Sequence, residues 1–209
     1  MQKILLCFLL LPLCVTAQFE DYYTEDFAAR HAREEKLKAD MRAFVGLIKI
    51  INGSYGYEEV VQVPSANARE LYNRARIWMA GAFVNSNYVI RFDDKDSNRI
   101  IVKSNLTYSF TKDEISYNND RLEFLLEIIA KDDRYMFRFY NLDLYKVATG
   151  SSFPSKRIDL RKHITIIKAG GKESNRRHRF YRFAALSKHF FKTVDHLKAG
   201  MNRPASGDF

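Results

Sequence analysis

The stretch LEFLLEIIAKDDRYMFRFYNLDLY, residues 122–145, decides how this chain folds. Apolar side chains occupy every second position before the tetrapeptide KDDR, and the same alternation resumes after it. Such alternation gives a β-strand one apolar face, and aspartate is a common turn residue. The stretch therefore predicts an antiparallel hairpin whose turn lies at residues 131–134.

Further strands are predicted on the N-terminal side of this hairpin. Apolar residues alternate over residues 88–92 and again over residues 100–110, on either side of the polar hexapeptide DDKDSN. The segment YEEVVQV, residues 57–63, reads as another strand and stops at Pro64. A polar loop is expected over residues 112–120, and the residues Ile158, Leu160, Ile164 and Ile166 suggest one or two more strands.

Helices are predicted at three places. Asn67 and Glu70 form a start typical of a capped helix, and the residues that follow on one face are Leu71, Ala75, Trp78 and Ala82. A surface helix is expected over residues 22–48, and a long helix over residues 175–199. Strands and helices together predict an α+β fold, an antiparallel sheet covered by helices.

The hexapeptide DDKDSN begins like a calcium-binding loop. A helix-flanked calcium loop needs glycine at its sixth position and a bidentate carboxylate at its twelfth. Counted from Asp94, these positions hold Arg99 and Asn105. We therefore expect the segment to be a hairpin turn, and a weak ion site is the alternative.

Three segments together resemble a known family. They are GYEEVVQVPSANARELYNRARIWMAGAF, VIRFDDKDSNRIIVKSN and LEFLLEIIAKDDRYMFRFYNLDLY, within about residues 56–145. They are similar to an exported bacterial domain of unknown function described as having a TATA-binding-protein-like fold. The positions that match its pattern are Tyr57, Glu58, Pro64, Leu71, Tyr72, Trp78, Asp93, Asp94, Ile100 and Ile101. The resemblance implies a curved antiparallel sheet backed by helices; it implies neither an activity nor DNA binding.

The N-terminal segment has the pattern of a secretory signal peptide. A short basic start is followed by an apolar run, Ile4 to Leu13, and by Val-Thr-Ala ending at Ala17. We predict cleavage between Ala17 and Gln18, which places the protein in the periplasm or at the cell surface of a Gram-negative bacterium. A lipid anchor at Cys14 is the alternative. Cleavage removes both cysteines, which excludes thiol nucleophiles, disulfides and cysteine zinc sites from the mature chain.

The predicted organisation has four parts. Residues 1–17 are the signal peptide, 18–52 a helical arm, 53–150 the α+β domain and 151–209 a basic extension. Residues 151–209 hold 14 Lys and Arg against 4 Asp and Glu, a surplus of ten, whereas residues 18–150 hold 19 against 21. Almost all of the net positive charge therefore lies in the last third of the chain.

The long C-terminal helix separates into two faces on a helical wheel. One face is largely apolar: Phe180, Phe183, Ser187, Phe190, Phe191, Val194, Leu197 and Met201. The opposite face carries the candidate anion-contacting residues: His178, Arg182, His189, Lys192 and His196. His189 and His196 are two turns apart, roughly 10 Å along the axis, so they cannot share one metal ion. No metal or other cofactor is expected.

Sequence motifs do not point to a reaction. The chain lacks a nucleophile elbow, an H-E-x-x-H zinc motif and a glycine-rich phosphate loop. The favoured function is an exported, non-catalytic binding or accessory module of the bacterial cell envelope that contacts anionic polymers or lipids. A hydrolase acting on an envelope polymer is the alternative. The simplest role for the C-terminal helix is to close the sheet, with its basic residues facing water. Export disfavours a nucleic acid partner.

Overall fold

The computed structural model describes residues 11–83, 89–112, 115–146, 156–169 and 176–203. The chain divides into two compact units, Met1–Ala39 and Asp40–Phe209. The described helices are α1 (Leu11–Leu47), α2 (Ala68–Ala82), α4 (Leu160–Lys168) and α5 (Arg176–Asn202). The strands are β1 (Lys49–Ile51), β2 (Ser54–Gln62), β3 (Ile90–Asp94), β4 (Arg99–Lys112), β5 (Ile115–Lys131), β6 (Arg134–Lys146) and β7 (Lys156–Ile158).

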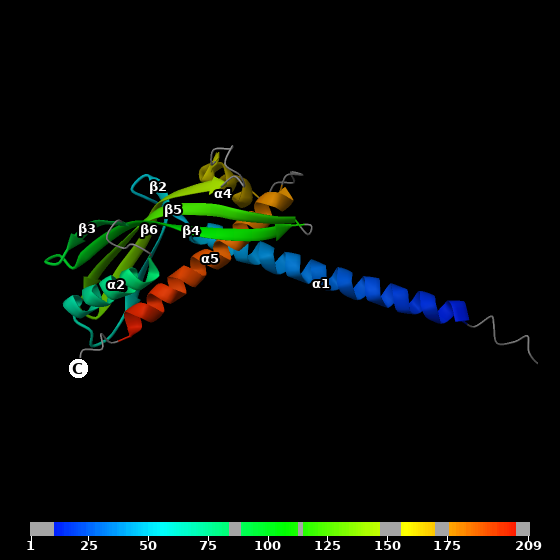
Figure 1. Ribbon diagram of the computed structural model, residues 1–209, viewed down its shortest axis with the longest axis horizontal. Coiled ribbons are helices and arrows are strands. Elements are labelled where there is room, and N and C mark those ends of the chain that lie inside the picture. Colours follow the sequence, from blue (N-terminus) through cyan, green and yellow to red (C-terminus); the bar gives the residue numbers. More distant parts are fainter. Residues whose placement is uncertain (1–10, 84–88, 113–114, 147–155, 170–175, 204–209) are drawn as a thin grey trace, which may run out of the picture. The chain divides into compact units, whose positions relative to one another are not determined.

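The seven described strands form one antiparallel sheet (Figure 1). Six of them lie in the order β1-β2-β6-β5-β4-β3, and the seventh, β7, pairs with β6 beside this row. The first half of β6 pairs with β2, and its last residues, Leu144–Lys146, pair with β7. The predicted hairpin at KDDR is confirmed, because Lys131 lies opposite Arg134 and Asp133 has the positive φ of a tight turn. Together with the helices described below, this confirms the predicted α+β fold.

Irregular pairings bend the sheet at three places. The register shifts by one residue between β3 and β4, between β4 and β5, and between β5 and β6. The shift in β6 includes Asn141, whose φ is 53° and whose backbone N–H donates to the Ser54 hydroxyl at 3.1 Å. Such β-bulges increase the local twist of a strand pair, which gives the sheet its curvature.

The predicted polar loop over residues 112–120 is wrong for most of its length. Strand β5 already begins at Ile115 and pairs with β4 as far as Lys112. The segment ISYNND lacks apolar alternation, so the sequence pattern did not mark it as a strand. It is extended because a long partner strand supplies its backbone hydrogen bonds.

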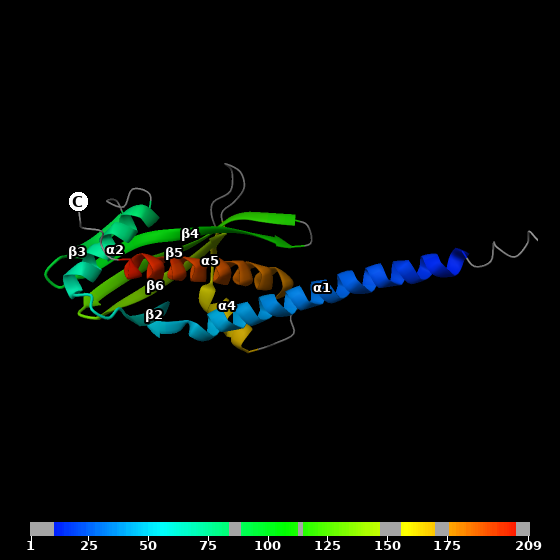
Figure 2. The same cartoon turned by 90° about the horizontal axis from the view of Figure 1, so that it is seen from below.

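Helices α2 and α5 lie on one face of the sheet (Figures 1 and 2). Helix α2 starts as predicted, with the Asn67 side chain accepting a hydrogen bond from the Glu70 backbone N–H at 2.8 Å. It packs on α5 through Trp78, whose indole N–H donates to Nδ1 of His196 at 3.1 Å. Gly200 allows this close approach, because a Cβ there would lie 2.5 Å from Cδ1 of Trp78.

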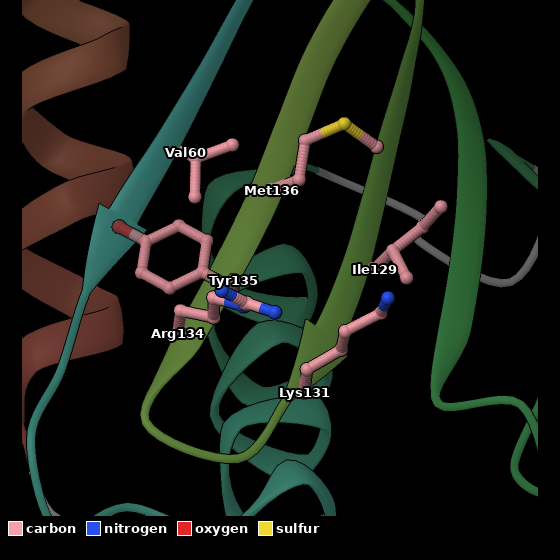
Figure 3. Close-up of a pocket in the computed structure, with 6 residues that line it drawn as sticks. All are labelled: Val60, Ile129, Lys131, Arg134, Tyr135 and Met136. Atoms are coloured by element: carbon pink, nitrogen blue, oxygen red, sulfur yellow. The ribbon is translucent and has the colours of Figure 1, made fainter.

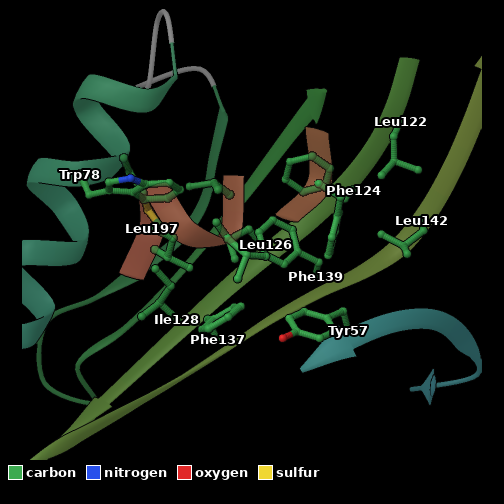
Figure 4. Close-up of a cluster of buried hydrophobic side chains, with 14 of the residues drawn as sticks. Tyr57, Trp78, Leu122, Phe124, Leu126, Ile128, Phe137, Phe139, Leu142 and Leu197 are labelled. Atoms are coloured by element: carbon green, nitrogen blue, oxygen red, sulfur yellow. The ribbon is translucent and has the colours of Figure 1, made fainter. Parts of the chain in front are cut away.

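The hydrophobic core fills the space between this face and the helices (Figure 4). Phe190 of α5 lies at its centre, with ring centroids 4.9 Å from Phe139, 5.6 Å from Tyr57 and 5.4 Å from Phe44. The ring pairs are edge-to-face, the arrangement that aromatic quadrupoles favour. Other core side chains from the sheet include Ile100, Val102, Leu122, Phe124, Leu126, Ile128, Phe137 and Leu144. The predicted apolar faces of these strands are confirmed.

The opposite face of the sheet carries a buried ion network. Glu127 of β5 is 0% exposed, although it does not face the helices. Its carboxylate accepts hydrogen bonds from Nε of Arg99, at 2.5 Å, and from Nε of Arg138. The guanidinium of Arg99 lies over the Phe92 ring and that of Arg138 over the Tyr140 ring. Stacked arginine and aromatic side chains therefore shield this carboxylate from water.

The segment that follows β6 differs from the prediction. Ile158 lies in the short strand β7, but Leu160, Ile164 and Ile166 belong to helix α4 rather than to a strand. The Asp159 carboxylate accepts a hydrogen bond from the Lys162 backbone N–H at 3.0 Å and so caps this helix. Because the apolar residues fall at both two-residue and four-residue steps, they fit either pattern.

Helix α5 confirms the predicted long C-terminal helix, and its apolar face is buried as expected. It packs on β4 and α2, so it belongs to the same compact unit as the sheet. Of the predicted signal peptide, residues 1–10 lie outside the described residues. Among the described residues, no helix is both long and apolar enough to cross a membrane.

Candidate functional site

The first candidate site is the set of predicted anion-contacting residues on α5, which we call the α5 stripe: His178, Arg182, His189, Lys192 and His196. One of them, Arg182, is not available to a ligand. Arg182 is 7% exposed, and its Nε lies 2.5 Å from a carboxylate oxygen of Asp120 in β5. Its guanidinium also lies over the Phe110 ring. The expectation that Arg182 faces water is therefore wrong: it ties α5 to the sheet inside the core.

Two histidines of the α5 stripe are engaged within the fold. His189 is half-buried, with Nδ1 2.9 Å from the Ala185 carbonyl oxygen and its ring against that of Tyr108. His196 is exposed, but its Nδ1 accepts the Trp78 hydrogen bond described above. Because Nδ1 is the acceptor there, the ring proton of neutral His196 lies on Nε2.

The remaining two members of the α5 stripe are Lys192 and His178. Lys192 is exposed and forms no ion pair with any other residue that the structure describes. The side chain of His178 lies outside the described part of the chain. The α5 stripe is therefore not the continuous row of solvated cations that the helical wheel predicted.

A second cationic surface lies on the end of β6, on β7 and on α4. It consists of five exposed side chains, which we call the β7–α4 patch: Lys146, Lys156, Arg161, Lys162 and Lys168. None of them forms an ion pair within the described ranges. The nearby carboxylate of Asp143 is occupied by Arg157, and that of Asp159 by the cap of α4.

Four of the five charges of the β7–α4 patch are unfavourably placed in the isolated protein. Lys146 lies directly opposite Lys156 in the β6–β7 pairing, and like charges at such positions repel each other. Arg161 and Lys162 stand in the first turn of α4, where the helix dipole disfavours cations. An anionic partner would relieve both unfavourable arrangements.

Sequence reasoning located the basic third of the chain but did not single out the exposed cations of α4. The cap at Asp159, followed by Leu160, Ile164 and Ile167 at helical spacing, could have revealed α4. With α4 recognised, the residues Arg161, Lys162 and Lys168 fall on a short surface helix, where an ionic contact surface is possible.

The hexapeptide DDKDSN is a hairpin turn, as predicted: Asp94 and Arg99 are paired in the β3–β4 ladder. Asp94 accepts hydrogen bonds from the Asp96 backbone N–H at 2.9 Å and from the Ser97 hydroxyl at 2.6 Å. These hydrogen bonds, that from Ser97 first, hold the pKa of the Asp94 carboxyl below its usual value. Both carboxylate oxygens of Asp94 therefore serve the turn itself.

Across the residues that the structure describes, no three His, Cys, Asp or Glu side chains gather as ligands. The positively charged surface, rather than a metal centre, is the chemistry that the described residues offer.

Two solved structures share the fold of this chain. A TBP-like protein from Parabacteroides distasonis ATCC 8503 aligns with a TM-score of 0.58 and 12% identity, over 75% of this chain and 97% of that one. A DUF4468 family protein from Bacteroides ovatus ATCC 8483 aligns with a TM-score of 0.57 and 14% identity, over 78% of this chain and 95% of that one. At such identities the similarity shows the fold alone.

The match to a family comes from the sequence itself. No curated protein is significantly similar to the chain. Residues 57–145 match the model of a family described as "Domain of unknown function (DUF4468) with TBP-like fold". This range extends from β2 to β6 and agrees with the resemblance seen in the sequence. Over residues 57–145, the chain thus matches the DUF4468 family and its TBP-like fold.

Proposed function

We propose that the chain is an exported, non-catalytic binding module of the bacterial cell envelope that holds anionic polymers on the β7–α4 patch. The observation that supports this function is the set of five exposed cations without ion pairs among the described residues. A surface of one charge sign concentrates oppositely charged ligands and accelerates their association. The unfavourable placement of these cations in the free protein adds a second reason to expect an anionic ligand.

The alternative function, a hydrolase of an envelope polymer, requires carboxylates or hydroxyls that converge in a cleft. The hollow found at the β5–β6 turn is lined by Val60, Ile129, Lys131, Arg134, Tyr135 and Met136. It contains no carboxylate to act as an acid or a base. The lining of this hollow therefore favours binding over hydrolysis.

Charge reversal at the start of α4 tests the proposed function. The variant Arg161→Glu/Lys162→Glu is expected to bind a sulfated polysaccharide such as heparin at least about tenfold more weakly at low salt. Acidic residues in the first turn favour a helix, so α4 should remain folded, and circular dichroism would check this. The measurement is the heparin affinity at several salt concentrations.

The matched control is Lys188→Glu/Lys192→Glu, which changes the net charge equally at exposed positions of α5. We expect this variant to lose much less affinity than the α4 variant. If both variants lost heparin affinity equally, the effect would come from net charge alone. If the control lost more affinity, the binding site would lie on α5 instead of α4.

Export is tested separately by intact-mass measurement of the protein produced in a Gram-negative host. We expect a mature chain that begins at Gln18, because the Val-Thr-Ala sequence ends in a small residue that suits signal peptidase. A lipid-modified chain beginning at Cys14 would instead make the protein a membrane-anchored lipoprotein. An uncleaved chain in the cytoplasm would contradict export.

A further inference from the structure

The face of the sheet opposite α2 and α5 contains a hollow beside the β5–β6 turn. Figure 3 shows it from this side, with α2 behind the strands. Its volume is about 320 Å³, and its lining comes from β2, β5 and β6. We call it the open-face hollow.

The floor of the open-face hollow is an apolar row across three strands. Val60 of β2 lies opposite Met136 of β6, and Met136 in turn lies opposite Ile129 of β5. Successive residues of a strand point to opposite faces, so all three side chains lie on the same side. Val60 is 56% exposed, which is high for an apolar side chain in a strand. An apolar group laid along this row would remove it from water, which is favourable.

Two cations border the floor at its turn end. Lys131 and Arg134 are the last pair of the β5–β6 ladder, both are exposed, and neither forms an ion pair with another described residue. The two turn carboxylates are directed elsewhere: Asp133 accepts the Ser65 backbone N–H at 2.7 Å, and Asp132 accepts that of Ala68 at 2.8 Å. Like charges directly opposite each other repel, so a bound anion would stabilise this end.

The opposite end of the floor contains carboxylates as well as an arginine. The next cross-strand row contains Glu58 opposite Arg138, and Arg138 opposite the buried Glu127. The positive charge of Arg138 is already paired with Glu127, and Glu58 would repel an anion. The open-face hollow therefore has a cationic end at the turn, an apolar middle and a far end that disfavours negative charge.

We propose that the open-face hollow binds an anionic amphiphile, a single apolar chain that ends in a carboxylate. The carboxylate lies between Lys131 and Arg134, and the chain runs along Ile129, Met136 and Val60. A mostly apolar lining with a few placed polar groups is typical of small-molecule sites, and the volume falls at the lower end of their range. This site lies on strands β2, β5 and β6 and is distinct from the β7–α4 patch.

The test is a calorimetric or NMR titration of the full chain with laurate below its micelle concentration. We expect Lys131→Glu/Arg134→Glu to weaken binding at least about tenfold, with Lys131→Gln/Arg134→Gln as the milder variant if charge reversal disturbs folding. Val60→Asn should also weaken binding, because it places an amide in the apolar row. Dodecanol, which has the same chain without the charge, should bind more weakly than laurate.

Two controls separate this site from general attraction and from the polymer-binding function. Lys188→Glu/Lys192→Glu makes an equal charge change on α5 and should leave laurate affinity unchanged. Arg161→Glu/Lys162→Glu should also bind laurate like the wild type, even though it loses heparin. The proposal would be overturned by any of three results. These are an equal loss of laurate affinity in the α5 control, unchanged affinity in the Lys131/Arg134 variants, and no saturable binding of laurate to the wild type.

Discussion

Replacing Arg182 by methionine is expected to lower the free energy of unfolding by about 3–5 kcal/mol. The reason is that Asp120, only 2% exposed, would keep a buried charge without its cation. Tyr108, which lies opposite Asp120 in the β4–β5 ladder, stays neutral because burial raises its pKa and the Asp120 charge raises it further, so it cannot supply the lost positive charge. Urea unfolding followed by circular dichroism measures the loss.

Two further variants make the Arg182 prediction specific. Arg182→Met combined with Asp120→Leu should recover most of the lost stability, because no unpaired charge remains in the core. Lys103→Met removes a partner of Glu123 from a pair whose lysine is exposed, and it should cost less than about 1 kcal/mol. If Arg182→Met were as mild as Lys103→Met, Arg182 would be a surface cation after all.

Glu127→Leu is expected to cost about 3 kcal/mol, the second large effect. The substitution leaves Arg99 and Arg138 side by side without the carboxylate that both contact. Their side chains are 38% and 20% exposed, so water can solvate them in part, and the loss should lie at the lower end for buried pairs. The measurement is again the free energy of unfolding in urea.

Glu127→Gln is the matched variant for this network. It keeps the shape and one hydrogen-bond acceptor, so its loss should be smaller than that of Glu127→Leu but still measurable. A loss below about 1 kcal/mol in Glu127→Leu would contradict the network's role and would show that the arginines reach solvent freely.

Much of the fold was predictable because local patterns and the tertiary structure agree. Strict alternation predicted the β5–β6 hairpin, and the Asn67 cap with its apolar face predicted α2. Helix α4 was missed because Leu160, Ile164 and Ile166 also fit the two-residue period of a strand. Strand residues 115–120 were missed because their pairing with β4, rather than their own composition, makes them extended.

The candidate sites were predictable only in part. Composition located the basic third, but the helical wheel could not show that Asp120, 62 residues away in sequence, binds Arg182. The open-face hollow depends on register, because Val60, Met136 and Ile129 become neighbours only when three strands pair. A single sequence contains no signal for that register until the sheet order is known.

Lysine footprinting tests the proposed polymer-binding function most directly. The folded chain is acetylated with and without a sulfated oligosaccharide, and protection is read at each lysine by mass spectrometry. The account predicts protection of Lys146, Lys156, Lys162 and Lys168, with Lys188 and Lys192 reacting as in the free protein. Protection confined to α5, or equal reactivity at every lysine with and without the ligand, would contradict it.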